Sequence, residues 1–215
     1  MLLERNNLVV MTGDSITDCG RARPLGDSRL DTLGDGYVSI IDHLLAATRP
    51  DLQVHILNTG VSGDTVRDLA ARWERDVVAL RPDVVSVMIG INDVWRQFDT
   101  DPAILKPVRL DEYSETLSRL VGGIMPKVRV AVVMLPFYLR SAPGDLMAAM
   151  REDYAAAARS VADTHGAIVV DTQAAFEAVL PYRSREQLAP DGVHPTALGH
   201  TLLARAWLRA VGFEW

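Results

Sequence analysis

LVVMTGDS, the stretch from Leu8 to Ser15, joins an apolar run to an abrupt Gly-Asp-Ser turn. A short apolar run without alternation, bounded by glycine, is typical of a strand that is buried on both faces of a parallel sheet. Ser15 therefore stands directly after the end of a predicted strand. In open parallel sheets the ligand lies outside the carboxyl ends of the strands, so this turn is a candidate site for chemistry.

Four further apolar runs follow, separated by amphipathic segments with helical spacing. The predicted strands are Leu8–Thr12, Val54–Leu57, Val84–Ile89, Val128–Leu135 and Ala167–Val170. The predicted helices are Tyr37–Ala47, Thr65–Leu80, Tyr113–Ile124, Leu146–Thr164 and Ala197–Val211. This alternation predicts an α/β three-layer sandwich around a five-stranded parallel sheet, flavodoxin-like, with strand order 2-1-3-4-5. We expect residues 1–215 to form a single domain, because no linker or repeat divides the chain.

The composition excludes several classes of protein. The 215 residues include 22 basic and 28 acidic side chains, which gives a formal net charge of −6. Without a basic stripe, a nucleic-acid partner is not expected. No run approaches the ~20 apolar residues that cross a bilayer, so no membrane partner is expected either. The N-terminus lacks a signal-peptide pattern, and we expect a cytoplasmic protein.

Polar groups follow each of the first three predicted strands. Ser15 follows the first strand, Gly63 lies in the stretch after the second, and Asn92 lies in the stretch after the third. In the order 2-1-3 the loops after these strands are neighbours. The sequence therefore predicts that a hydroxyl, a backbone N–H and a carboxamide meet at one edge of the sheet.

A further polar pair, Asp191 and His194, stands just before the last predicted helix. An aspartate and a histidine three residues apart on one turn can form a hydrogen bond from Nδ1–H to the carboxylate, which leaves Nε2 free to face a hydroxyl. The carboxylate then fixes the tautomer and stabilises the imidazolium. A serine hydroxyl needs such a base because it is a weak nucleophile at neutral pH. The three residues predict a catalytic set of Ser15, His194 and Asp191.

Four ordered blocks resemble the SGNH, or GDSL-type, hydrolase family, and they span essentially the whole chain. They are GDSIT from Gly13, SGDT from Ser62, GIND from Gly90 and DGVHP from Asp191. The resemblance implies the SGNH hydrolase fold and a serine esterase. It also implies that the N–H groups of Ser15 and Gly63 and the side chain of Asn92 form the oxyanion hole.

Shorter stretches resemble one branch of that family, the intracellular acetylxylan esterases, which deacetylate xylo-oligosaccharides. These stretches are GDSITDCGRARP from Gly13, NDVWRQ from Asn92 and GFEW at the end of the chain. The resemblance implies an acetylated saccharide as substrate, an acetyl-serine intermediate and no cofactor. It leaves open an esterase or thioesterase acting on other small acyl or lipid esters. In another class, a non-catalytic carbohydrate-binding module also remains open.

Candidate substrate contacts are Trp95, Arg96 and Arg21, which lie in predicted loops beside the proposed nucleophile and oxyanion hole. Indole faces and guanidinium donors suit a sugar ring with many hydroxyls. Each has a structural alternative. Trp95 could pack under its own loop, and the arginines could pair with Asp14, Asp18 or Asp93.

The remaining reactive side chains give no further site. Cys19, the single cysteine, is interpreted as structural because no activating histidine stands at a suitable strand end. The other histidines lack metal-ligand spacing, so no metal site is predicted. The apolar end Val211–Trp215 leaves a homo-oligomer open without deciding it.

Overall fold

The structure is a computed structural model that describes residues 1–23, 32–98, 107–140 and 144–214. Its centre is a parallel sheet of five strands in the order β2-β1-β3-β4-β5. The strands are β1 (Leu8–Gly13), β2 (His55–Asn58), β3 (Val84–Met88), β4 (Val130–Met134) and β5 (Ile168–Val170). The predicted strand order is confirmed, and the predicted strand ends differ from the observed ones by one or two residues.

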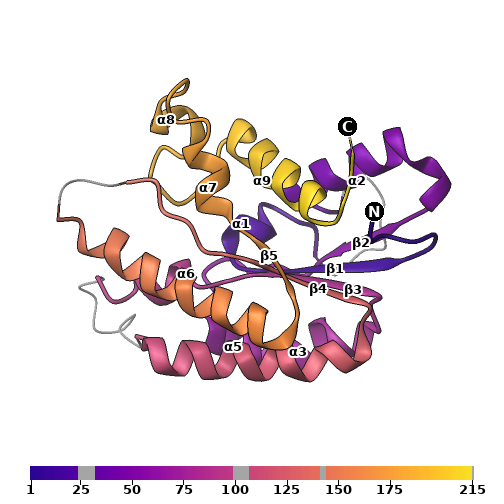
Figure 1. Ribbon diagram of the computed structural model, residues 1–215, viewed down its shortest axis with the longest axis horizontal. Helices are drawn as coiled ribbons and strands as arrows, with labels where there is room; N and C mark the ends of the chain where they lie inside the picture. The colour runs from indigo at the N-terminus through magenta and orange to yellow at the C-terminus, as the bar shows by residue number, and fades with distance from the viewer. Residues whose placement is uncertain (24–31, 99–106, 141–143, 215) are drawn as a thin grey trace.

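Helices cover both faces of the sheet (Figure 1). One face carries α2 (Tyr37–Thr48), α7 (Thr172–Glu177) and α9 (Ala197–Ala210), and the other carries α3 (Val66–Asp76), α5 (Leu110–Ile124) and α6 (Leu146–His165). Short helices follow the strands or join longer elements: α1 (Ser15–Asp18), α4 (Ile91–Trp95) and α8 (Arg185–Leu188), with 3-10 turns at Pro50–Leu52, Val78–Leu80 and Met125–Lys127. The expected three-layer sandwich is confirmed.

The side chains of β1 show why the strands appear in the sequence as continuous apolar runs. Val9 and Met11 pack into the core on the α2 and α9 side, and Val10 packs into the core on the α3 and α5 side. All three are fully buried. A strand covered on both faces has no polar side to alternate with. The central strand also buries Ser86, whose hydroxyl accepts a hydrogen bond of 3.0 Å from the indole Nε1–H of Trp207 on α9.

The helix predicted over Thr65–Leu80 is shorter in the structure. Thr65 caps α3 from outside in a capping box with Asp68, whose carboxylate accepts the Thr65 N–H at 2.9 Å. The helix ends at Asp76, and a 3-10 turn carries the chain to Arg81, which has a positive φ of 52°. The apolar spacing continued past the helix end because Val77 is still buried there.

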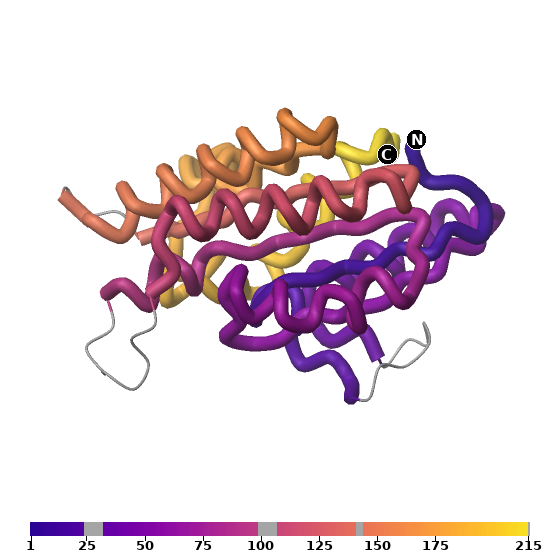
Figure 2. Tube along the Cα trace, turned by 90° about the horizontal axis from the view of Figure 1, so that it is seen from below, coloured from indigo at the N-terminus to yellow at the C-terminus, as the bar shows by residue number. Residues whose placement is uncertain are grey.

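The two chain ends lie beside each other (Figure 2). The N–H of Leu2 donates to the carbonyl of Val211 at 2.7 Å, and Phe213 is buried in the core on the α9 side. The apolar C-terminal segment therefore folds onto its own domain as far as Phe213, and Trp215 lies outside the described residues. Among the helices that the structure describes, none is both long and apolar enough to span a bilayer.

Candidate active site

The turn that carries Ser15, the predicted nucleophile, is built where β1 ends. Gly13 has a φ of 159°, and a side chain there would overlap the carbonyl of Met88 on the neighbouring strand β3. The carboxylate of Asp14 then caps α1 by accepting the N–H of Ile16 at 3.0 Å. As the first residue of α1, Ser15 is half-buried at the carboxyl edge of the sheet. The turn thus places a hydroxyl at the edge where the sequence predicted it.

A chain of hydrogen bonds joins Ser15 to His194 and Asp191. The Ser15 Oγ atom lies 3.0 Å from His194 Nε2, and His194 Nδ1 lies 2.6 Å from Asp191 Oδ2. The other carboxylate oxygen of Asp191 accepts the backbone N–H groups of Val193 at 2.9 Å and of His194 at 2.7 Å. Within the turn that joins the two residues, both carboxylate oxygens of Asp191 are therefore held by hydrogen bonds. This is the geometry of a serine, its base and the group that orients the base.

The charge state of Asp191 sets the tautomer of His194. Partial burial raises the pKa of Asp191, but hydrogen bonds from the His194 ring and from two backbone N–H groups outweigh it. The pKa of Asp191 therefore lies below its ordinary value. An ionised carboxylate only accepts hydrogen bonds, so Nδ1 carries the ring proton. The lone pair of Nε2 consequently faces the Ser15 hydroxyl.

The loops after the neighbouring strands β1, β2 and β3 carry three hydrogen-bond donors at the same edge of the sheet as this hydroxyl. Among the described residues, the backbone N–H groups of Ser15 and Gly63 have no acceptor. The Asn92 Nδ2 group donates to the Asp64 carbonyl at 3.0 Å, which uses one of its two protons. Gly63 has a positive φ of 84°, a conformation that favours glycine. The loops therefore bring free donors of the three predicted kinds to one edge.

Helix α4 holds the Gly63 loop by two further contacts that the sequence did not predict. The Arg96 guanidinium donates to the Gly63 carbonyl, and both carboxylate oxygens of Asp93 accept the Val66 N–H, at 3.0 and 3.2 Å. Asn92, Asp93 and Arg96 thus act together from one short helix. The Gly63 loop is positioned by the segment that also supplies the Asn92 donor.

Two buried acids support these turns and carry raised pKa values. Burial raises the pKa of Asp93 to about 7, against the hydrogen bond from the Val66 N–H. Burial likewise raises the pKa of Asp14 to about 7, although the hydrogen bond from the Ile16 N–H acts in the opposite direction. Both side chains are at most 1% exposed. They hold the backbone and have no access to a substrate.

Arg72 on α3 is a functional residue that sequence reasoning missed. Its buried guanidinium donates to the Thr59 carbonyl at 2.6 Å and to the Gly13 carbonyl at 2.9 Å, and it pairs with Asp64 at 2.6 Å. It therefore ties the nucleophile turn to the loop that carries Gly63. The available signal was its position beside Trp73, on the apolar stripe of an otherwise charged helix.

The three predicted substrate contacts lie in different surroundings. Trp95 is 39% exposed, and its ring centre lies 6.1 Å from that of His194. Arg96 is half-buried and bound to Gly63. Arg21 is 8% exposed, and its Nε donates to the Gly60 carbonyl at 2.6 Å. The structure thus brings Trp95 to the catalytic histidine and places Arg21 behind the neighbouring loop.

The alternative that Arg21 and Arg96 pair with Asp14, Asp18 or Asp93 is not found among the described residues. Arg21 and Arg96 bind carbonyls, and the ion pair of Arg96 is to Asp68 at 3.9 Å. Asp18 pairs instead with Arg23 at 2.6 Å. It also accepts the N–H of Ser62 at 2.9 Å, which supports the Gly63 loop from the other side.

Cys19 has a histidine partner that the sequence did not reveal. Its Sγ atom lies 3.4 Å from Nε2 of His200 on α9, whose Nδ1 accepts the N–H of Tyr37 at 3.2 Å. Burial lowers the pKa of His200 to about 4 and raises the pKa of Cys19 above its ordinary value. A neutral imidazole with an occupied Nδ1 directs its own N–H toward the sulfur. The pair thus stays a thiol and a neutral histidine, consistent with a structural Cys19.

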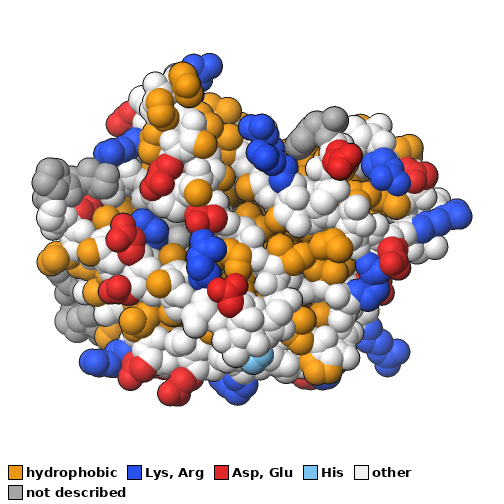
Figure 3. Space-filling view, in the orientation of Figure 1, with side chains coloured by type: hydrophobic (Ala, Val, Ile, Leu, Met, Phe, Trp, Pro, Cys, Tyr) orange, Lys and Arg blue, Asp and Glu red, His pale blue; other side chains and the backbone are white. Residues whose placement is uncertain are grey.

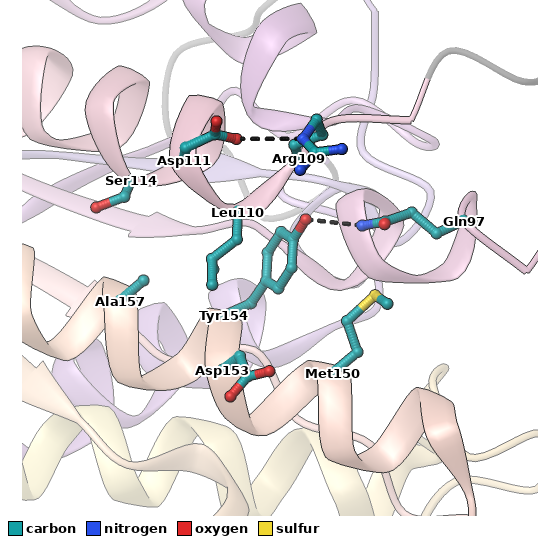
Figure 4. Close-up of a pocket in the computed structure, with 9 residues that line it drawn as sticks. All are labelled: Gln97, Arg109, Leu110, Asp111, Ser114, Met150, Asp153, Tyr154 and Ala157. Atoms are coloured by element: carbon teal, nitrogen blue, oxygen red, sulfur yellow. Dashed lines mark hydrogen bonds and ion pairs between the residues drawn. The ribbon is translucent and has the colours of Figure 1, made fainter.

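A cavity of about 660 Å³ lies between α5 and α6, with Gln97 from the segment after α4 in its wall (Figure 4). In Figure 4, Gln97 points toward Tyr154 across its rim, and the two side chains are joined by a hydrogen bond of 2.7 Å. Neither Ser15 nor His194 lines this cavity. The His194 side chain is 48% exposed and that of Asp191 is 45% exposed. The catalytic chain of hydrogen bonds therefore lies at an open surface.

Comparison with known proteins identifies the family of this site. The model of the GDSL-like lipase/acylhydrolase family matches residues 11–202, a span that includes all four sequence blocks. The chain belongs to this family. It is accordingly a carboxylic ester hydrolase, which sets aside a binding module without activity. The family assignment agrees with the geometry, since acyl transfer needs a nucleophile, a base and oxyanion donors.

One known protein is similar to this chain over nearly its whole length. It is an acetylxylan esterase of Geobacillus stearothermophilus, 49% identical over 96% of this chain and 94% of its own length. Crystal structures of three variants described as its catalytic mutants, S15A, D191A and H194A, have TM-scores of 0.95, 0.95 and 0.96. Each is 47% identical and covers 100% of this chain and 98% of its own. Ser15, Asp191 and His194 carry the same numbers here.

Proposed function

We propose that the protein removes acetyl groups from acetylated xylo-oligosaccharides, with Ser15 as nucleophile, His194 as general base and Asp191 as the residue that orients the base. The observation that carries this proposal is the distance of 3.0 Å between Ser15 Oγ and His194 Nε2. The backbone N–H groups of Ser15 and Gly63, which have no acceptor within the described part of the chain, add to it. The similar acetylxylan esterase, and the three variants described as its catalytic mutants, support the same assignment.

The first half of the reaction forms an acetyl-enzyme. Ser15 Oγ attacks the acetyl carbonyl carbon while His194 Nε2 takes the hydroxyl proton, and Asp191 stabilises the imidazolium. The carbonyl oxygen becomes an oxyanion. It accepts hydrogen bonds from the N–H groups of Ser15 and Gly63 and from the second Nδ2 proton of Asn92. The tetrahedral intermediate collapses when His194 returns the proton to the departing sugar oxygen.

The second half releases acetate through the same groups. Water gives a proton to His194 Nε2 and attacks the acetyl carbon, and the same three donors hold the new oxyanion. When the C–O bond to Ser15 breaks, His194 protonates Ser15 Oγ. Each donor of this kind typically contributes ~10²–10³ in rate. Apart from the ester and the attacking water, every group in these steps belongs to the chain.

The surface around Ser15 favours a hydrophilic alcohol over a long lipid chain. The side chains of His194 and Asp191 are about half exposed, and neither residue lines an apolar tunnel among the described cavities. Trp95 offers a partly exposed indole face beside His194, which is a suitable surface for the apolar face of a sugar ring. Arg96 has its guanidinium at the same edge. These features support a saccharide as the leaving group.

The proposal is tested by acetate release from acetylated xylo-oligosaccharides, measured beside hydrolysis of p-nitrophenyl acetate and p-nitrophenyl butyrate. We expect acetate release from the saccharides and a steep fall in kcat/KM from acetate to butyrate. Hydrolysis of aryl acetate without saccharide deacetylation would retain the serine esterase and overturn the substrate. Equal hydrolysis of both aryl esters would favour an esterase for longer acyl chains.

A further inference from the structure

A second cavity, of about 300 Å³, lies between α6 and α7 at the ends of β4 and β5. Its walls come from Leu135 and Pro136 after β4, Asp171 after β5, and one face each of α6 and α7. Arg151 on α6 lines it and is 8% exposed. The proposed reaction uses none of these residues.

Arg151 lacks the partners that a buried guanidinium needs. Within the described residues its side chain donates no hydrogen bond, and its Nε atom is buried without any partner. Its one ion pair, to Glu152, spans 3.5 Å and involves a carboxylate side chain that is 72% exposed. Arginine keeps its charge in proteins, and a buried charge is costly unless it is paired and hydrogen-bonded. In the described part of the chain, the Nε–H of this guanidinium is thus a donor without a partner, on a side chain at the wall of a cavity.

The acidic groups of this cavity are already engaged. Asp171 accepts Arg159 at 2.6 Å and the Ala174 N–H at 2.9 Å, and Glu177 accepts Gln173 at 2.9 Å. Figure 3 shows acidic and basic side chains interspersed over this face of the molecule. Because three acidic and two basic side chains line the cavity, a dianion is disfavoured there. A ligand with a single negative charge fits better.

We propose that this cavity is a binding site for a small monocarboxylate, held by the guanidinium of Arg151. A planar carboxylate matches the guanidinium fork with two parallel hydrogen bonds. The apolar part of the ligand would meet the aliphatic wall, which consists of Leu135, Pro136, Ala155, Ala156 and Ala174. If the proposed function holds, the acetate that the enzyme releases belongs to this class, but carboxylate binding does not depend on that function.

The cavity is connected to the catalytic loop through one extended segment. Gln173, in the cavity wall, accepts the N–H of Tyr138 at 3.1 Å, and the next residue, Leu139, donates its N–H to the carbonyl of Gly192 at 2.9 Å. Gly192 lies between Asp191 and His194. The bound carboxylate would therefore sit behind the segment that supports the catalytic turn, at a position separate from the Ser15 surface.

The test is a titration of sodium acetate into ¹⁵N-labelled protein, followed by NMR at constant ionic strength. We expect saturable shifts of the Arg151 Nε–H signal and of the Ala155 and Ala174 amides. The shifts should persist in Ser15→Ala, which separates this site from catalysis. They should disappear in Arg151→Met and persist in the control Arg119→Met, which removes an exposed arginine of α5.

Three results would overturn the proposal. The first is an absence of saturable shifts in the wild type, and the second is an equal affinity in Arg151→Met. The third is tighter binding of sulfate than of acetate, because the site would then prefer a dianion. If Arg151→Met does not fold, acetate binding is measured in Arg151→Lys instead. Losing the planar fork should weaken acetate binding, and unchanged binding would contradict the assignment.

Discussion

The Nε2 atom of His194 lies 3.0 Å from the Oγ atom of Ser15, although 179 positions separate the two residues in the sequence. The turn after β1 delivers the hydroxyl, and the turn before α9 delivers the imidazole. Asp191 fixes the ring from its other side at 2.6 Å. The hydrogen bond between Ser15 and His194 therefore depends on how the fold places the turn after β1 beside the turn before α9.

Asp191→Asn tests the role assigned to the carboxylate. Asparagine can offer an N–H to His194 Nδ1, which stabilises the tautomer whose Nε2 carries the proton and cannot act as a base. We expect kcat to fall by about 10⁴ with little change in fold. The measurement is steady-state hydrolysis of p-nitrophenyl acetate, with circular dichroism as the check on folding. Asp163→Asn, at an exposed position of α6, is the matched control. Wild-type kcat in Asp191→Asn would contradict the assignment.

Arg96→Met separates a positioning role from a substrate-binding role. Arg96 donates to the Gly63 carbonyl, so its loss should loosen the Gly63 N–H that receives the oxyanion. We expect kcat to fall by about 10-fold, less than the ~10²–10³ for deleting a donor outright, with KM nearly unchanged. Arg67→Met is the control, because Arg67 lies on α3 and pairs with Glu112 at the surface. A raised KM with normal kcat would instead make Arg96 a substrate contact.

Trp95→Ala tests the predicted sugar platform. The indole is partly exposed beside His194. A sugar ring stacked on it would bury part of its apolar face, at about 25 cal/mol per Å² of apolar surface. We expect KM for acetylated xylo-oligosaccharides to rise about 2- to 10-fold, while KM for p-nitrophenyl acetate changes less. Phe98→Ala removes an equally exposed aromatic ring from the same segment and serves as control. Equal changes with both substrates would show that Trp95 supports the loop and does not select the sugar.

The apolar runs were sufficient to predict the sheet, because strands covered on both faces must be apolar throughout. The hydrogen-bonded arrangement of Ser15, His194 and Asp191 was predictable because each residue belongs to a short recognisable turn. The supporting contacts were not. Arg72 binds carbonyls 59 and 13 positions away, and only the folded chain shows that these carbonyls share one guanidinium.

Arg21 is a residue whose role the sequence predicted differently from what the structure shows. Its position after the nucleophile turn suggested contact with substrate, but the side chain turns inward to the Gly60 carbonyl. Side-chain direction in an irregular loop depends on tertiary contacts that local sequence patterns do not encode. His200 is a similar case, since its spacing on α9 gives no indication that Cys19 lies 3.4 Å away.

The raised pKa of Asp93 predicts a pH dependence of stability. A folded-state pKa of about 7, above the ordinary 3.8, means that the folded protein binds a proton that the unfolded chain has released. The contribution of Asp93 to the free energy of unfolding therefore decreases as pH rises from about 4 to about 7. Asp93→Asn keeps an acceptor for the Val66 N–H and cannot ionise.

Urea unfolding of both proteins between pH 4.5 and 7.5 measures this effect, in the window set by the two pKa values. The stability of Asp93→Asn relative to wild type should increase with pH across this range. Asp51→Asn is the control, because Asp51 is exposed and its pKa is lowered, which confines its effect to more acidic solution. A difference between Asp93→Asn and wild type that is independent of pH would contradict the raised pKa.

The central claim, that Ser15 carries the acyl group, is tested most directly by trapping the intermediate. Wild-type protein is mixed with acetylated xylo-oligosaccharide, quenched in acid during turnover, digested and analysed by tandem mass spectrometry. The account predicts one acetyl group on Ser15 and none in the Ser15→Ala protein. Because Cys19 lies only four positions away, fragmentation must locate the group between the two side chains. An acetyl group on Cys19, or turnover by Ser15→Ala at the wild-type rate, would contradict the account.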